Sequence, residues 1–131
     1  MQLTPELHAL AVITTATALM WLPYVAARLR ARGVLALANV DPGVPAEPPW
    51  AKRARQAHAN AVENLVVFAP LVLVAAIAGI STPLTTAASV TFVVARLAHY
   101  FLFLFGVLYV RTCAFFVGAV ATLVIAASLL F

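Results

Sequence analysis

Residues 9–22 read ALAVITTATALMWL, a run of apolar or small side chains without a single charge. With its neighbours, this run is long enough for a helix that crosses a bilayer, which needs about 20 apolar residues at 1.5 Å each. The whole chain has the same character, because 65% of its 131 residues are hydrophobic and only 9% are charged. A soluble domain is about a quarter charged, so this composition indicates a surface that faces lipid.

Four spans fit the length of the chain. We expect membrane-spanning helices over residues 5–29, 53–79, 83–105 and 110–131, with a cytoplasmic loop over residues 30–52. In that loop Asp41-Pro42-Gly43 is a turn signal, and we expect Pro45, Pro48 and Pro49 to prevent a regular helix. Because four spans use roughly 80–90 residues, the sequence predicts one domain over residues 1–131, an all-α bundle of four antiparallel transmembrane helices.

Positive charges are concentrated around the expected loop. Six of the eight Lys and Arg residues flank it, namely Arg28, Arg30, Arg32, Lys52, Arg53 and Arg55. Since positively charged loops stay in the cytoplasm, we expect the first and third loops there and both termini outside. The net charge of +4 is then a topology signal, and we expect no nucleic-acid partner. Cys113 is the single cysteine, which offers no disulfide and no zinc-binding spacing, so we expect no metal site.

Polar side chains interrupt the second and third spans, where each charge costs about 2.5–3.5 kcal/mol by insertion scales and therefore indicates a special role. Gln56, Asn60 and Glu63 are spaced i, i+4 and i+7, so they share one face of the second helix. Arg96 and His99 lie on the third helix, with Arg96 at a depth similar to that of Glu63. Electrostatics alone would pair Glu63 with Arg96, either beside a ligand or simply to join membrane helices.

A larger pattern extends from the second span to the fourth. It comprises the run RARQAHANAVENL over residues 53–65, followed by Arg96, His99, Gly106, Arg111, Thr112 and Phe115. This pattern resembles the signature of the MAPEG family (membrane-associated proteins in eicosanoid and glutathione metabolism), in a bacterial-type form. The resemblance implies a homotrimer of four-helix bundles in the bacterial inner membrane, with glutathione between adjacent subunits near the cytoplasmic face.

The resemblance also implies an activity, that of a glutathione transferase or peroxidase acting on lipophilic electrophiles from the bilayer, with glutathione as cosubstrate. It assigns the glutathione contacts to Arg28, Arg30, Arg53, Gln56, Asn60, Glu63, His99 and Phe103, and thiol activation to Arg111 and Thr112. A hundredfold rise in thiol acidity takes roughly 2.7 kcal/mol, which one arginine or hydroxyl can supply in a partly dry site. Which arginine of the first helix faces the site stays open.

Two positions depart from the family pattern. Gln56 stands where the mammalian enzymes carry an arginine, and Phe103 stands where many members carry a tyrosine. Gln56 brings no charge, and Phe103 cannot hydrogen-bond a ligand. The alternative is therefore a non-catalytic MAPEG-like membrane protein whose polar cluster serves trimer assembly, and the sequence leaves enzyme activity open. A small multidrug exporter is disfavoured because the first helix has no acidic residue after Glu6.

Overall fold

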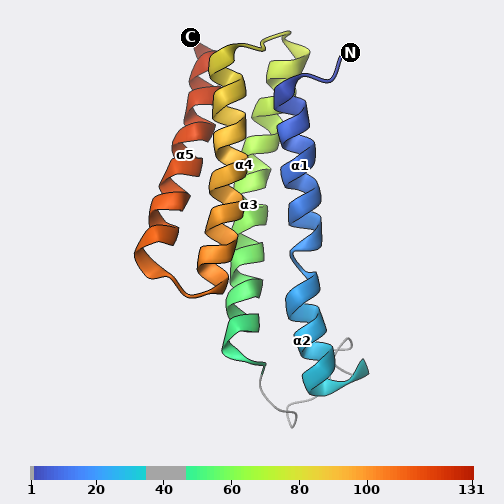
Figure 1. Cartoon of the computed structure of the whole chain (residues 1–131). Helices are drawn as coiled ribbons and strands as arrows, with labels where there is room; N and C mark the ends of the chain where they lie inside the picture. The colour runs from blue at the N-terminus through green and yellow to red at the C-terminus, as the bar shows by residue number, and fades with distance from the viewer. Residues whose placement is uncertain (1, 35–46) are drawn as a thin grey trace.

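The chain forms a bundle of long helices in the computed structural model, which describes residues 2–34 and 47–131. The helices are α1 (Pro5–Leu19), α2 (Leu22–Arg32), α3 (Pro49–Ile77), α4 (Pro83–Leu104) and α5 (Leu108–Leu130). Within these described ranges, four segments are long and apolar enough to cross a membrane, with α1 and α2 together forming the first. Successive spans run in opposite directions, and both termini lie at the same end of the bundle (Figure 1). This confirms the predicted all-α architecture with four spans.

The first span is broken at Met20 and Trp21, between α1 and α2. Pro23 lies in the first turn of α2. Because proline has no N–H, it cannot donate to the carbonyl group of Leu19, four residues earlier. Tyr100 of α4 stabilises the break, because its hydroxyl donates to the Met20 carbonyl oxygen at 3.3 Å. The span therefore keeps one direction but contains a joint, and it extends to Arg32, beyond the expected end at residue 29.

The start of α3 corrects the expected loop boundary. The helix begins at Pro49, with Pro48 as its N-cap residue, although we expected these prolines to prevent a helix up to residue 52. Proline is well suited to the first helical position, because the N–H that it lacks would have no intrahelical partner there. The expected turn at Asp41-Pro42-Gly43 and the expected effect of Pro45 lie outside the described residues.

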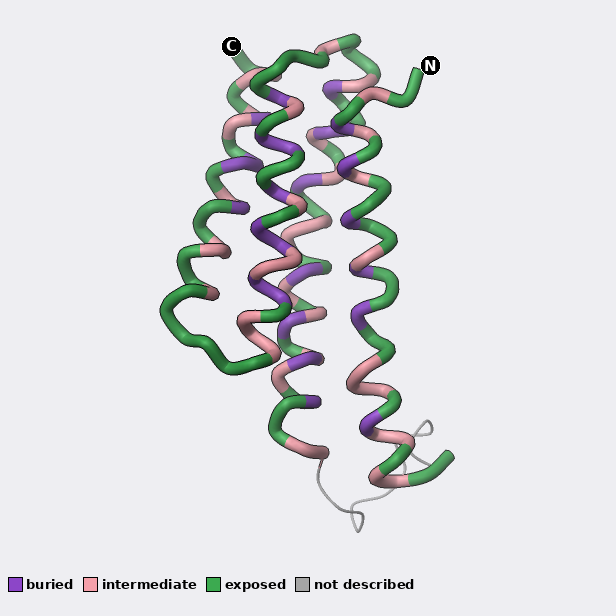
Figure 2. Tube along the Cα trace, viewed as in Figure 1, coloured by how far each residue is buried: buried purple, intermediate pink, exposed green. Residues whose placement is uncertain are grey.

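Apolar side chains from four helices form the core of the bundle. The buried cluster comprises Ile13, Phe68, Val72, Ala88, Phe92, Ala121 and Ile125. At its centre the rings of Phe68 and Phe92 are stacked, with centroids 3.8 Å apart. In Figure 2 the buried residues of each helix face inward and the exposed ones face outward. Many of the exposed residues are large and apolar, as a lipid-facing surface requires.

The end of the bundle that carries the termini is fastened by Glu6. This carboxylate is only 2% exposed, and it lies against the beginning of α4. Its oxygens accept hydrogen bonds from the hydroxyl groups of Ser81 at 2.9 Å, Thr85 at 2.6 Å and Thr86 at 2.9 Å. A buried carboxylate is tolerated when its oxygens are satisfied in this way. The polar residues of the predicted site lie toward the other end of the bundle.

Candidate functional site

Arg96 of α4 is the centre of a buried polar cluster. It is 2% exposed, and its Nη1 donates to Asn60 Oδ1 on α3 at 3.1 Å. Its guanidinium lies over the ring of Phe115 on α5, 5.2 Å from the centroid. Gly118 leaves room for it, because a Cβ atom at that position would lie 3.1 Å from Arg96 Nε. Arg96 thus contacts both of the helices beside α4.

The cluster corrects one expectation about charge. Within the described part of the chain, no ion pair joins Glu63 to Arg96, and Asn60 takes the place that we gave to Glu63. The Nε and Nη2 atoms of Arg96 are buried and have no hydrogen-bond partner among the residues that the structure describes. An unsatisfied buried donor costs about 1–3 kcal/mol, so these two nitrogens favour an additional acceptor such as a ligand, a water molecule or a partner subunit.

Aromatic rings connect this cluster to Arg111. His99 is buried, with its ring centroid 5.7 Å from that of Phe103 and 6.1 Å from that of Phe115. The Cζ atom of Arg111 lies over the ring of Phe103, 4.3 Å from its centroid. Four of the predicted residues, Asn60, His99, Phe103 and Arg111, are therefore brought together around Arg96 and Phe115. Sequence reasoning gave Phe103 only a ligand contact, whereas the structure shows that it supports an arginine.

Arg53 of α3 has a partner within the chain. Its Nε donates to the Leu104 carbonyl oxygen at 2.9 Å, at the carboxyl end of α4. Carbonyl groups in the last turn of a helix lack intrahelical donors and favour a nearby cation. The chain then turns at Gly106, which has a φ of +76° and lies beside the Arg53 guanidinium. The predicted contact of Arg53 with a ligand would come in addition to this capping role.

Other predicted residues lie apart from the buried cluster. Gln56 and Glu63 are exposed on the outward face of α3, and Arg30 is exposed on α2. Thr112 is also exposed, and its hydroxyl donates to the Leu108 carbonyl oxygen at 3.2 Å on its own helix. A single chain therefore does not gather the whole predicted site.

Arg28 belongs to a separate group of charges between α2 and the start of α3. A cavity of about 290 Å³ is lined there by Arg28, Arg32, Glu47, Lys52 and Arg55. Arg28 Nε lies 2.8 Å from Glu47 Oε1, and Arg55 Nη2 lies 3.1 Å from Glu47 Oε2. Burial alone would raise the pKa of Glu47, but the hydrogen bond from Arg28 and the charges of Arg55, Arg28 and Arg32 hold it below its usual range. Sequence reasoning missed Glu47, although an acid among so many arginines was a usable signal.

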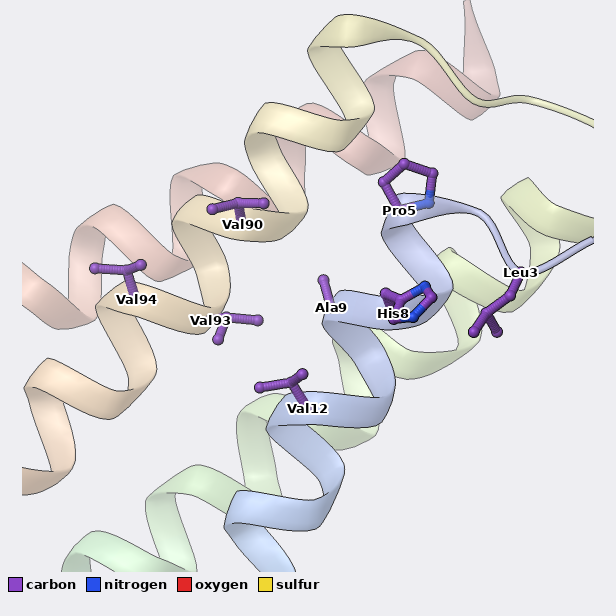
Figure 3. Close-up of a pocket in the computed structure, with 8 residues that line it drawn as sticks. All are labelled: Leu3, Pro5, His8, Ala9, Val12, Val90, Val93 and Val94. Carbon is purple, nitrogen blue, oxygen red and sulfur yellow. The ribbon is translucent and has the colours of Figure 1, made fainter.

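An apolar groove of about 470 Å³ lies near the opposite end, between α1 and α4. Figure 3 shows Ala9 and Val12 of α1 beside the same space as Val90 and Val93 of α4, with His8 at one side. None of the predicted site residues lines this groove. Its lining suits lipid chains and offers no counterpart for a charged ligand such as glutathione.

Four apolar spans with a buried polar cluster toward one end define a helical integral membrane protein. The sequence matches the MAPEG family over residues 8–131, and the chain therefore belongs to that family. The match includes the first span, which the motif resemblance had not covered. Comparison with curated proteins gave no match, and neither did comparison with solved structures.

Proposed function

We propose that this chain is a membrane-embedded glutathione-binding protein that acts as a transferase or peroxidase on lipophilic electrophiles. The observation that carries the proposal is the position of Arg111. Its guanidinium is half-buried at the start of α5 and is fixed over Phe103. A cation held beside the sulfur of glutathione stabilises the thiolate, which is the reactive form. The MAPEG family, to which the chain belongs, includes glutathione transferases.

The surrounding residues suit the charges of a tripeptide. Two buried guanidinium nitrogens of Arg96 have no partner among the described residues, and they can donate to an anionic group of the ligand. Arg28 and Arg53 are cations at the same end of the bundle as Arg111, and arginines bind carboxylates in a bidentate manner. In this proposal Asn60 and Glu63 hold the ligand's polar backbone and its ammonium group.

We propose further that the site is completed in a homotrimer. Glu63 and Gln56 are exposed on a helix long enough to cross the membrane. Ionisable side chains inside spans nearly always face other protein or a water-filled cavity and seldom face lipid. A second copy packed on this face of α3 would cover Glu63, and glutathione would lie between the subunits. In this proposal the protein lies in a bacterial inner membrane, and the basic residues around the first loop favour a cytoplasmic position for the first and third loops.

Isothermal calorimetry on the detergent-solubilised protein tests the binding of glutathione. We expect a saturable heat at millimolar glutathione, which Arg111→Ala and Glu63→Ala both weaken. Lys52→Ala is the charge-matched control, since Lys52 has no part in the proposed glutathione site. If the wild-type protein gives neither heat nor thermal stabilisation at millimolar glutathione, the proposal is wrong.

A second candidate function is a non-catalytic MAPEG protein whose polar residues serve trimer assembly. Two observations favour it, because Arg96 has an intrachain partner in Asn60 and the Thr112 hydroxyl is bonded to its own helix. In that case Glu63→Gln or Arg96→Leu would dissociate the trimer, while glutathione would have no effect on either variant. Size-exclusion chromatography with light scattering measures this directly. A stable trimer from both variants would count against the assembly role.

A further inference from the structure

The basic cavity between α2 and the start of α3 has no role in the proposed chemistry beyond that of Arg28. We propose that this cavity binds a phosphate group, supplied by the headgroup of an anionic phospholipid or by a soluble phosphate. It has a volume of about 290 Å³, and its lining consists entirely of charged residues from three segments: Arg28 and Arg32 of α2, Glu47, and Lys52 and Arg55 of α3.

The charges around the cavity are unbalanced. Four cations line it, and Glu47 is the one acid among the lining residues. The other acids of the chain are Glu6, Asp41 and Glu63. Glu6 is bonded at the opposite end and Glu63 lies on the outward face of α3, while Asp41 is outside the described residues. The lining residues therefore carry an excess of positive charge, which favours an anion from outside the chain.

Glu47 shows how the cavity holds an anionic group. Arg28 contacts one oxygen of the Glu47 carboxylate and Arg55 contacts both, so side chains from α2 and α3 bind the same anionic group. Arginine forks and lysine ammonium groups are the side chains that bind phosphate oxygens best. A phosphate group lying beside Glu47 would contact the other cations that line the cavity.

The position of the cavity favours a lipid headgroup as the source of the phosphate. α2 and the beginning of α3 project beyond the turn between α4 and α5, so the cavity lies at the tip of the bundle (Figure 1). The charged residues of both spans gather at this end, and charged ends of membrane spans usually lie at the level of the lipid headgroups. Basic pockets between transmembrane helices on the cytoplasmic side are a recognised form of anionic lipid site.

Native mass spectrometry of the purified full-length chain tests the proposal. The probes are phosphatidylglycerol, phosphatidylcholine as the zwitterionic control, and inorganic phosphate. We expect phosphatidylglycerol to remain bound, and Lys52→Gln/Arg55→Gln to weaken it about tenfold or more, since each cation near a surface contributes to lipid attraction. Arg30→Gln is the control, because Arg30 is exposed on α2 outside the cavity and its loss removes the same type of charge.

The result also identifies the source of the phosphate. Binding of phosphatidylglycerol alone indicates a lipid headgroup, whereas equal binding of inorganic phosphate indicates a soluble phosphate. Either result supports the site. The proposal fails if neither phosphatidylglycerol nor inorganic phosphate binds, or if Arg30→Gln weakens binding as much as Lys52→Gln does. Lys52→Gln alone leaves both Glu47 ion pairs intact, so it provides the test if the double variant does not fold. Because Lys52 and Arg55 have no role in the proposed glutathione site, either proposal can fail without the other.

Discussion

The guanidinium carbon of Arg111 lies 4.3 Å from the ring centroid of Phe103, so that α4 fixes a cation that belongs to α5. A contact of this kind contributes about 0.5–2 kcal/mol, depending on how far the cation is desolvated. Phe103 stands where many MAPEG members carry a tyrosine, and its ring can support the arginine without the hydroxyl group. The substitution therefore removes a hydrogen bond to a ligand while it keeps the platform for Arg111.

The first prediction concerns this platform. Phe103→Ala should lower glutathione turnover about tenfold, because Arg111 loses its fixed position, whereas Phe103→Tyr should keep the wild-type rate or exceed it. The measurement is the rate of conjugation with a lipophilic electrophile as a function of pH. Phe105→Ala is the control, since Phe105 is 73% exposed and lies near the same turn. An equal loss in both alanine variants would show that Phe103 has no special role.

The second prediction concerns Arg111 itself. Arg111→Ala should reduce turnover about a hundredfold if its charge stabilises the thiolate, as the loss of comparable donors does in other enzymes. The pH at which the rate rises should move upward, because an unassisted thiol ionises near pH 8.5. Arg111→Lys should restore part of the rate. A profile that is unchanged in Arg111→Ala would remove the assignment of thiol activation.

The third prediction concerns the space beside Arg96. In an exposed helix, Gly→Ala stabilises by about 1 kcal/mol, but at Gly118 we expect destabilisation of about that size or more. The new methyl group would lie 3.1 Å from Arg96 Nε, and Asn60 and Phe115 hold the guanidinium on its other sides. Thermal unfolding in detergent measures the effect. In an Arg96→Met background the same substitution should become neutral or stabilising, and equal effects in both backgrounds would exclude the contact.

The fourth prediction concerns Thr85, which donates to the buried carboxylate of Glu6 at 2.6 Å. Thr85→Val keeps the shape of the side chain but removes this bond and also the acceptor of the Thr82 N–H in the capping box of α4, so the cost should be at least about 1.5–3 kcal/mol. Thr91→Val on the same helix is the control, since Thr91 is exposed. Thermal unfolding compares the two variants. Equal melting temperatures would show that Glu6 does not fasten this end of the bundle.

The fifth prediction is a dependence of stability on pH that arises from Glu47. Its pKa is held below the ordinary value of 4.5 in the folded chain, against the effect of burial, by Arg28 and its neighbouring arginines. A lowered folded-state pKa means that the ion pairs stabilise fully above pH 4.5 and lose their contribution as the pH falls further. The wild-type melting temperature should exceed that of Glu47→Gln at neutral pH, and the difference should shrink below that value. A constant difference would contradict this reasoning.

The sequence predicted the spans well because composition and length determine which segments can enter a bilayer. Residues 5–19 and 83–104, for example, fall within the expected spans. Boundaries were less accurate at prolines, since the same residue that interrupts a helix also begins one, as Pro49 does. The break before Pro23 is likewise a local effect of a missing N–H group, which the position of the proline indicates although overall composition does not.

The side-chain contacts within the predicted site were harder to predict from the sequence than the spans. The spacing of Gln56, Asn60 and Glu63 predicted that they share one side of α3, but the rotation of that helix decides which of them meets Arg96. At about 100° per residue, Glu63 lies about 60° around the helix from Asn60, which is enough to leave Asn60 against Arg96 and Glu63 facing outward. Charge alone favoured Glu63, yet its carboxylate remains on the outward face. The sequence of one chain does not contain the neighbouring surface that Glu63 would meet.

The central claim is that glutathione binds between subunits, beside Glu63 and Arg111. An experimental structure of the protein with saturating glutathione tests it most directly. We predict a trimer with tripeptide density between α3 of one subunit and the neighbouring copy, its sulfur next to the guanidinium of Arg111. Clear density for the trimer with no tripeptide at this interface, or a tripeptide bound far from both residues, would contradict the account.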